Sequence, residues 1–207
     1  MALVTKAYKG SRDFYPEEMR LRSEVFARWR QVAESFAFEE YDGPFLEERA
    51  LYEAKSGQEL VSKQLYDFVD KGGRSVAIRP EMTPTFARMV AGKLGELPRP
   101  IRWYSIPNLW RYEKPQRGRL REHFQFNADI MGGEPFLADL EMLQLANSLL
   151  KNFDLNNEVE IRVNHRGLWQ EILASVWGFG SSEQDEETKL KITKLIDASD
   201  KMDASVL

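Results

Sequence analysis

The sequence predicts an α+β fold with a mainly antiparallel sheet flanked by helices. Long segments with helical spacing of apolar residues are interspersed with short alternating segments, and the turns between the short segments are typical of hairpins. A parallel sheet would need a regular strand–helix–strand rhythm, which the sequence lacks. With 207 residues, 43% of them hydrophobic, the chain is expected to bury one substantial core.

Five segments are predicted to be helices. Apolar residues recur along one face between residues 17 and 36, which indicates a helix that packs on a core. Thr83 followed by Pro84 is typical of a helix start, with an N-cap hydroxyl and a proline at the first helical position, so residues 83–93 are expected to be helical. The remaining helices are expected at residues 135–153, 167–177 and 188–198.

Short strands are expected around a proline and a glycine turn. Aromatic and β-favouring residues surround Pro44 at residues 38–47, and a proline there indicates a strand end or a sheet edge. Residues 64–70 and 74–78 are predicted to pair as a hairpin, because Lys71-Gly72-Gly73 supplies turn residues between them. A further short strand is expected at residues 159–163.

A second hairpin is predicted from residues 101–113 and 119–131, joined by a loop with Pro115 and Gly118. Residues 119–131 alternate between two sides of the strand. The apolar side carries Leu120, Phe124, Phe126, Ala128 and Ile130, and the polar side carries Arg119, Arg121, His123, Gln125, Asn127 and Asp129. A polar side of this kind is most often a solvated sheet face.

Positive charge concentrates at this hairpin. Between residues 111 and 121, five Lys and Arg side chains accompany one carboxylate, Glu113, whereas the whole chain has 29 Lys and Arg against 33 Asp and Glu. The guanidinium group suits phosphate oxygens and stacks on flat rings, so the hairpin suits a nucleoside polyphosphate. Gln125 and Asp129, farther along, suit an ammonium group or a ring N–H, and Glu81 and Thr83 lie just ahead of a helix. This is the layout of a site that activates an amino acid.

Composition excludes several classes of site. The absence of Cys removes thiolate nucleophiles and cysteine metal ligands, and with two His no zinc site is expected. His165 is expected to cap a helix or lie on the surface, and the strand aromatics Trp103, Tyr104, Trp110 and Tyr112 are expected to pack rather than to stack on bases. No apolar run is long enough for a membrane span, so the chain is expected to be soluble and cytoplasmic.

Four segments resemble the class II aminoacyl-tRNA synthetases, most closely the histidyl-tRNA synthetase family. Residues 111–132 are similar to motif 2 in its histidyl form, with Arg-Tyr-Glu before the loop and Arg-Leu-Arg-Glu-His-Phe-Gln-Phe-Asn-Ala-Asp after it. Residues 38–47 resemble motif 1, residues 79–84 resemble the histidine-site loop, and residues 10–16 resemble an N-terminal segment of the family. The resemblance covers about residues 9–166 in order and spacing.

The resemblance implies roles at the matching positions. Arg111 would be the catalytic residue, which stabilises charge as the substrate carboxylate attacks ATP. The ATP-binding residues would be Arg111, Glu113 at the adenine amino group, Arg119 and Arg121 at the outer phosphates, and His123 where the family often stacks an aromatic ring on adenine. The histidine-binding residues would be Glu81, Thr83, Arg111, Gln125 and Asp129, the last of which would accept from the imidazole N–H. Pro44 would lie at a homodimer interface.

The implied function is that of a histidine–tRNA ligase, which uses ATP with Mg²⁺ to form histidyl-adenylate and then transfers histidine to tRNA(His). An alternative is the histidine-sensing regulatory subunit of ATP phosphoribosyltransferase. This subunit is similar in fold but is not an enzyme. An RNA-binding module is disfavoured by the acidic pI near 5.4.

Motif 3, a second histidine-binding segment and an anticodon-binding domain are not found in the sequence. We therefore expect an incomplete catalytic core at residues 1–177, followed at residues 178–207 by a linker and the start of a helical insertion. Such a fragment of a longer synthetase is expected to be nearly inactive alone.

Overall fold

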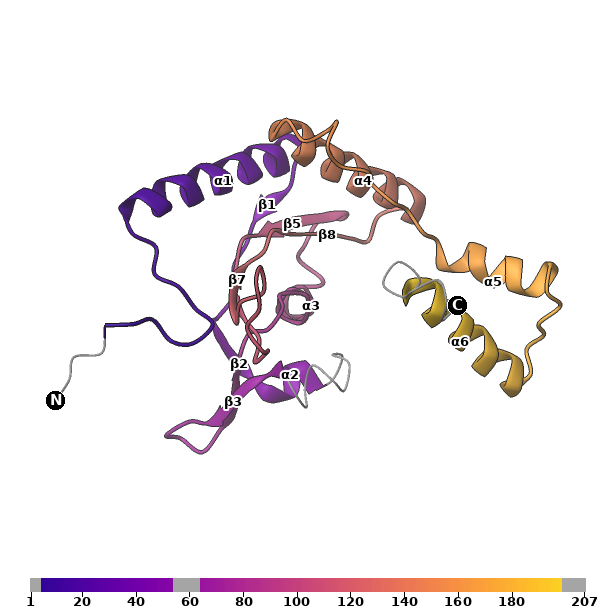
Figure 1. Ribbon diagram of the computed structural model, residues 1–207, viewed down its shortest axis with the longest axis horizontal. Coiled ribbons are helices and arrows are strands. Elements are labelled where there is room, and N and C mark those ends of the chain that lie inside the picture. Colours follow the sequence, from indigo (N-terminus) through magenta and orange to yellow (C-terminus); the bar gives the residue numbers. More distant parts are fainter. Residues whose placement is uncertain (1–4, 54–63, 199–207) are drawn as a thin grey trace. The chain divides into compact units, whose positions relative to one another are not determined.

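The structure, a computed structural model, describes residues 5–53 and 64–198 (Figure 1). The chain forms two compact units, Met1–Val159 and Glu160–Leu207. The domain boundary expected from the sequence lies later, between residues 177 and 178, and stays a prediction. In the described part of the chain, no helix is both long enough and apolar enough to cross a membrane.

The first unit contains α1 (Pro16–Ser35), β1 (Glu39–Glu40), β2 (Leu46–Glu48), α2 (Arg49–Glu53), β3 (Tyr66–Val69), β4 (Ser75–Ile78), α3 (Thr83–Gly92), β5 (Ile101–Ser105), β6 (Asn108–Trp110), β7 (Glu122–Phe124), β8 (Asn127–Met131) and α4 (Pro135–Asn152). The second unit contains α5 (Arg166–Ser175) and α6 (Glu183–Ala198). The α+β class with mainly antiparallel pairing is confirmed, since only β1 pairs parallel to its neighbour among the strands described.

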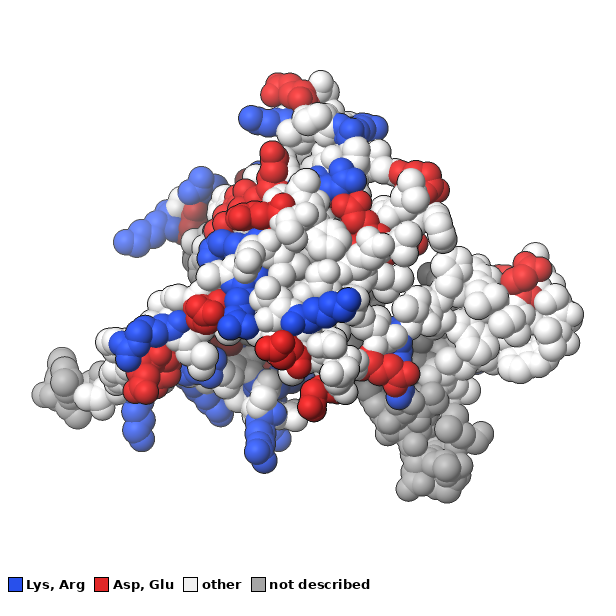
Figure 2. All heavy atoms as spheres, turned by 90° about the horizontal axis from the view of Figure 1, so that it is seen from above, with Lys and Arg blue, Asp and Glu red and all other residues white. Residues whose placement is uncertain are grey.

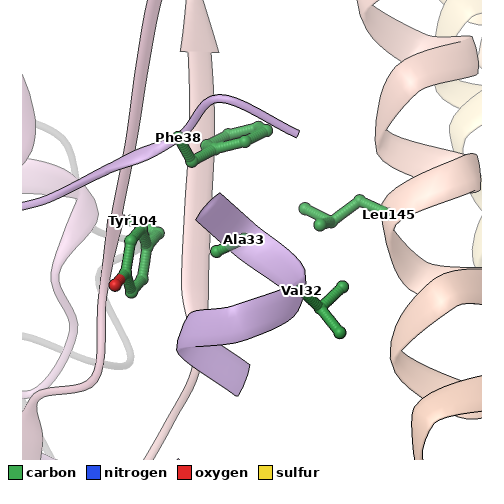
Figure 3. Packing of buried hydrophobic residues seen from close by; sticks show 5 residues of the cluster. All are labelled: Val32, Ala33, Phe38, Tyr104 and Leu145. Carbon is green, nitrogen blue, oxygen red and sulfur yellow. The ribbon is translucent and has the colours of Figure 1, made fainter. Parts of the chain in front are cut away.

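A three-stranded sheet in the order β1-β5-β8 lies between helices, with α1 and α4 on one side and α3 on the other (Figure 1). The core on the first side joins Val32 and Ala33 of α1, Tyr104 of β5 and Leu145 of α4, together with Phe38 (Figure 3). Burying each large apolar side chain here contributes roughly 1.5–3 kcal/mol. The helix predicted at residues 17–36 packs on this core, as expected. The helix predicted at residues 135–153 also forms, but it packs through Leu145, Met142 and Leu149, while the apolar side chains of Phe136, Leu140 and Leu143 are exposed.

The core on the other side of the sheet is built from α3. Met82, Phe86 and Val90 pack against Tyr41 and Ile101, and all five are buried. The helix predicted at residues 83–93 is confirmed, but its N-cap is Met82 rather than Thr83, because the N–H of Phe86 already bonds to the Met82 carbonyl oxygen at 2.9 Å. Thr83 is the first helical residue and is exposed.

The first predicted hairpin is confirmed. Strands β3 and β4 pair antiparallel, and β2 joins them in the order β2-β4-β3. Asp70 closes the turn by accepting from the N–H groups of Gly72 at 2.8 Å and Arg74 at 2.9 Å, while Gly73 takes a φ of +80° that favours glycine. Pro44 lies between β1 and β2, as a strand-end proline should.

The second predicted hairpin forms, but each of its strands is broken. Strands β5 and β8 pair in one sheet and β6 and β7 in another. The break falls at Pro107, which has no N–H to continue a ladder, and at Gln125, whose N–H bonds to the Pro107 carbonyl oxygen at 3.3 Å. The prediction of two continuous strands at residues 101–113 and 119–131 was therefore wrong about the length of the strands.

Other predictions differ at the end of the chain. Residues 159–163 are not a strand, because no described strand pairs with them and their apolar side chains are exposed. Helix α6 begins at Glu183, before the start predicted at residue 188, since Glu183, Asp185 and Glu186 in its first turn favour the helix N-terminus. The Nδ1 atom of His165 accepts from the Leu168 N–H at 3.2 Å, which confirms its predicted capping role.

Candidate functional site

Arg111 connects the second hairpin to the loop that precedes α3. Its N–H donates to the Arg121 carbonyl oxygen at 2.8 Å, so it continues the β6–β7 pairing, and its Nε donates to the Pro80 carbonyl oxygen at 3.0 Å. The side chain is half-buried. Within residues 5–53 and 64–198, no carboxylate forms an ion pair with this guanidinium, which leaves its charge available for an anion.

The loop that contacts Arg111 is held in place by Arg79. The Arg79 guanidinium, 6% exposed, donates to Asp42 Oδ1 at 2.6 Å, to the Gly43 carbonyl oxygen at 2.9 Å and to the Asn108 carbonyl oxygen at 3.0 Å. Sequence reasoning gave Arg79 no role, although it belongs to the loop segment that resembles the family. Its buried contacts fix where the next residues lie.

Glu81 and Thr83 follow directly on this loop, as the sequence predicted. Glu81 is half-buried and Thr83 is exposed at the start of α3. Arg111 bonds to the carbonyl oxygen of Pro80, the residue before Glu81, so the backbone of this loop meets the end of the hairpin that carries Arg111. The predicted role of Glu81 and Thr83 in binding an amino acid stays a prediction.

Glu113, His123 and Arg111 interact electrostatically. Burial lowers the pKa of His123, the positive charge of Arg111 lowers it further, and Glu113 opposes both effects. His123 is therefore neutral near pH 7 and can present a flat ring. Glu113 is engaged in an ion pair with Arg119, whose Nη2 donates to Glu113 Oε1 at 2.7 Å. Arg119 itself is largely exposed and can leave this pair at a small cost.

Arg121 lies in surroundings different from those expected for a phosphate ligand. Its guanidinium is buried, 4.2 Å from the ring centre of Tyr112, and donates to the Glu113 carbonyl oxygen at 3.0 Å and to Tyr8 Oη at 3.1 Å. Its backbone N–H donates to the Gly10 carbonyl oxygen at 2.8 Å. The predicted contact between Arg121 and a phosphate stays a prediction.

The strand face beyond the basic loop carries acceptors. Asp129 lies on β8 opposite Trp103 of β5, half-buried, and burial raises the pKa of its carboxyl group. Gln125 lies at the break between β7 and β8, exposed, where its amide donates to Asn127 Oδ1 at 2.9 Å. Both therefore lie on the hairpin where the sequence placed them, Asp129 in the sheet core and Gln125 at the break.

The remaining predicted features are on the surface. Pro44 is exposed, beside the exposed apolar side chains of Phe45 and Leu46. Figure 2 shows Lys and Arg side chains interspersed with Asp and Glu over the face seen there.

Among the residues that the structure describes, no three His, Asp or Glu side chains come together as a metal site would need. Each of the four strand aromatics packs on a neighbouring ring, as predicted: Trp103 on Tyr41, Tyr104 on Phe126, and Trp110 and Tyr112 on Tyr66.

Comparison with known proteins gives the family of this chain. The family model of histidyl-tRNA synthetase matches residues 10–204. The chain belongs to the histidyl-tRNA synthetase family. It is 53% identical over 189 residues to the histidine–tRNA ligase of Leptospira biflexa, and 48% identical over 165 residues to that of Thermoplasma volcanium. These alignments cover 91% and 80% of this chain but only 43% and 38% of the two relatives.

The fold of this family member is also found in solved structures. A Bacillus halodurans protein described as an ATP phosphoribosyltransferase regulatory subunit/histidyl-tRNA synthetase aligns with a TM-score of 0.75 and 22% identity. The alignment covers 89% of this chain and 46% of that one. At this identity the likeness shows the class II catalytic-core fold alone. The chain spans less than half the length of the curated relatives given above.

Proposed function

We propose that this chain supplies the ATP- and histidine-recognising part of a histidine–tRNA ligase. The observation that carries the proposal is the position of Arg111, whose guanidinium has no carboxylate partner in the described chain and bonds to the loop before Glu81 and Thr83. A cation fixed between a nucleotide-suited hairpin and a carboxylate–hydroxyl pair is positioned for the junction between ATP and an amino acid.

The residues divide the substrate contacts among them. Arg111 binds the α-phosphate and the histidine carboxylate, and stabilises the negative charge that grows as the carboxylate attacks phosphorus and pyrophosphate leaves. Glu113 accepts from the adenine amino group, and neutral His123 stacks on the ring. Arg119 leaves its pair with Glu113 to bind the outer phosphates. Mg²⁺ enters bound to ATP, since such ions are held mainly by substrate phosphates.

Histidine binds on the Glu81 side of Arg111. The α-ammonium group is held by Glu81, Thr83 and Gln125, and the imidazole N–H donates to Asp129. A tRNA(His) terminal hydroxyl then takes the histidyl group from the adenylate without a covalent enzyme intermediate. Each of these side chains binds a substrate or stabilises charge on it, and none forms a covalent bond. The chain therefore acts by positioning the substrates and by stabilising charge.

We further propose that the 207-residue polypeptide alone has little activity, because it spans only 43% of its Leptospira biflexa relative. Assembly as a cytoplasmic homodimer through the surface around Pro44 is part of the same proposal. The exposed rings and apolar side chains there, Phe45 at 41% and Leu46 at 45%, support a partner surface.

The test is histidine-dependent ATP–pyrophosphate exchange by the unsubstituted chain and by Arg111→Ala, with histidine omitted in one arm. Little exchange by the chain alone, with recovery when the C-terminal part of the Leptospira biflexa relative is added, is the expected result. Exchange by the chain alone that needs both histidine and Arg111 would overturn the claim of low activity.

A third result would replace the proposal. If the chain binds histidine but never exchanges, even with the added part, the non-catalytic regulatory subunit of ATP phosphoribosyltransferase becomes the better description. Absence of both binding and exchange in every arm would remove the synthetase proposal.

A further inference from the structure

Arg79 joins the loop before α3 to the edge of β6. The Trp110 N–H donates to the Arg79 carbonyl oxygen at 3.1 Å. The next N–H along the chain, that of Arg111, donates instead to Arg121, in the direction of β7. Successive N–H groups of a strand point to opposite edges, so Arg79 lies along the edge of β6 that faces away from β7. Its side chain adds to this contact, because Nε donates to the Asn108 carbonyl oxygen at 3.0 Å.

The same residue reaches a third segment, which lies between β1 and β2. Its Nη1 donates to Asp42 Oδ1 at 2.6 Å and to the Gly43 carbonyl oxygen at 2.9 Å. Its backbone N–H donates to the Phe45 carbonyl oxygen at 3.1 Å. The side chain is only 6% exposed, and hydrogen bonds between a guanidinium and a carboxylate are stronger than those between neutral groups. Arg79 therefore holds the loop both against β6 and against residues 42–45.

The orientation of Arg111 depends on this loop. Arg111 Nε donates at 3.0 Å to the carbonyl oxygen of Pro80, the residue that follows Arg79. Pro80 is fully buried and its ring fixes φ, so its carbonyl oxygen is held in place together with Arg79. A displacement of Arg79 would therefore displace the acceptor that orients the Arg111 guanidinium.

We propose that Arg79 is a positioning residue for the activation of the amino acid. It holds the Pro80 carbonyl oxygen where this atom orients Nε of Arg111, and thereby directs the remaining N–H groups of that guanidinium to the α-phosphate. The inference rests on the proposed function and deepens it. The contacts of Arg79 described above are all with protein groups, so Arg79 acts through Arg111. Misplacing a catalytic group by about 1 Å can cost roughly a hundredfold in rate.

The contacts of Arg79 need a planar guanidinium. Nε and Nη1 bond to acceptors on two different segments at once, and a lysine ammonium group has no donor at the position of Nε. Arg79→Lys is therefore expected to keep the bond to Asp42 and to lose the bond to Asn108. Because the charge is kept, the variant tests the link to β6 rather than the loss of a buried cation.

The experiment measures ATP–pyrophosphate exchange in a double-mutant cycle of Arg79→Lys and Arg111→Lys, with the C-terminal part of the Leptospira biflexa relative added. Arg79→Lys alone is expected to lower kcat about thirtyfold and to change the KM values for ATP and histidine less than about threefold, because Arg111 stabilises charge that develops in the transition state. In Arg111→Lys the bond from Nε to Pro80 is already lost. There, Arg79→Lys is expected to lower kcat less than about threefold.

The matched control is Arg88→Lys. Arg88 lies on α3, and its Nη2 donates to Glu47 Oε1 at 2.7 Å, so it is also an arginine paired with a carboxylate beside the same loop. This pair is partly exposed, and the substitution is expected to keep kcat within about twofold. Equal losses of kcat in Arg88→Lys and Arg79→Lys would overturn the inference, since the effect would not depend on the contact with β6.

The remaining outcomes separate this inference from the proposed function. An unchanged kcat in Arg79→Lys, or an equal loss with and without Arg111→Lys, would overturn the role of Arg79, while exchange by the unsubstituted chain with the added part still supports the proposed function. No exchange by that unsubstituted pair would overturn both.

A milder variant serves if urea unfolding shows that Arg79→Lys does not fold. Asp42→Asn keeps an oxygen that accepts from Arg79 Nη1 but removes the charge that strengthens this bond. Its kcat is expected to fall about threefold when Arg111 is present and to stay unchanged in the Arg111→Lys background. No fall, or the same fall in both backgrounds, would overturn the inference.

Discussion

The guanidinium of Arg121 stacks on the ring of Tyr112 at 4.2 Å and donates to the carbonyl oxygen of the next residue, Glu113, at 3.0 Å. The same side chain bonds to Tyr8 Oη, and the backbone of Arg121 bonds to Gly10. A buried guanidinium with these partners joins the N-terminal segment to the segment after β6 that carries Glu113. Arg121 is therefore expected to position Glu113 for adenine.

Arg121→Lys tests this positioning role. Lysine keeps the charge but lacks the planar fork that stacks on Tyr112 while its Nε meets a carbonyl oxygen. The substitution is expected to lower Tm by about 5 °C and to raise the KM for ATP more than it lowers kcat, measured in the complemented exchange assay. A phosphate-binding role alone would change ATP affinity and leave Tm in place.

The matched control is Arg119→Lys, since Arg119 has the same charge on the same hairpin but is 60% exposed. Its Tm is expected to stay within about 2 °C of the unsubstituted chain. Equal Tm changes for the two variants would contradict the assignment of Arg121 as the buried anchor.

Gly10→Ala probes the other half of the same junction. Gly10 has a φ of +88°, and a Cβ atom there would lie 2.7 Å from Cγ of Arg121. The substitution is expected to cost roughly 2–4 kcal/mol from backbone strain and overpacking together. The control Gly73→Ala has a similar φ of +80° with nothing within 4 Å of the added atom, so it should cost only about 1–2 kcal/mol. Urea unfolding measures both, and equal costs would mean that the contact with Arg121 relaxes freely.

Periodicity predicted the parts of the fold that depend on local spacing. The stripe of α1 and the alternation of residues 119–131 were readable because one side of each packs on a core, as Phe124 and Phe126 do against α1. The break at Pro107 and the failed strand at residues 159–163 depend on which strand lies alongside. The local spacing of apolar residues carries no information about the neighbouring strand. Neither the break at Pro107 nor the absence of a strand at residues 159–163 could therefore be predicted from the sequence.

In the candidate site, too, residues close together in sequence could be predicted and residues with distant partners could not. Arg111, Glu113 and His123 could be found because they share one hairpin, where alternation and loop chemistry place them together. Arg79 could not, since the partners of its guanidinium, Asp42 and Asn108, lie far away in sequence. Residues that act through such long-range contacts have to be found in the structure.

His123→Phe tests the predicted adenine stack. A phenyl ring stacks better than an imidazole, so ATP binding is expected to tighten two- to fivefold, which corresponds to about 0.5–1 kcal/mol. The measurement is calorimetric titration with MgATP. Unchanged or weaker binding would mean that His123 contacts ATP through a ring nitrogen rather than by stacking.

The pH dependence of stability gives a separate test of the His123 environment. The folded-state pKa lies below the reference value of 6.5, so the unfolded chain takes up the proton first as the pH falls. The contribution of His123 to the free energy of unfolding is therefore full above pH 6.5 and lost as the pH falls toward the folded pKa. Urea unfolding at pH 7.5 and 5.5 should show this loss in the unsubstituted chain and a smaller one in His123→Phe.

Asp129→Asn should separate stability from function. Burial raises the folded pKa of Asp129 above its reference value of 3.8, so the folded state binds the proton more tightly and the free energy of unfolding falls as the pH rises through that window. Asparagine removes this penalty. The variant is expected to be more stable than the unsubstituted chain at pH 7, to lose that advantage near pH 3.5, and to bind histidine about tenfold more weakly.

Asp70→Asn is the matched control with the opposite sign. Hydrogen bonds from the Arg74 backbone and side chain hold the pKa of Asp70 below 3.8, so its contribution to stability is present above that pH and is lost as the pH falls. Asp70→Asn should therefore be less stable than the unsubstituted chain at pH 7, with unchanged histidine binding, because the β3–β4 turn carries no substrate contact. If both variants shift stability in the same direction, burial is not what sets the pKa of Asp129, and a charged partner from outside the sheet face must be neutralising its carboxylate.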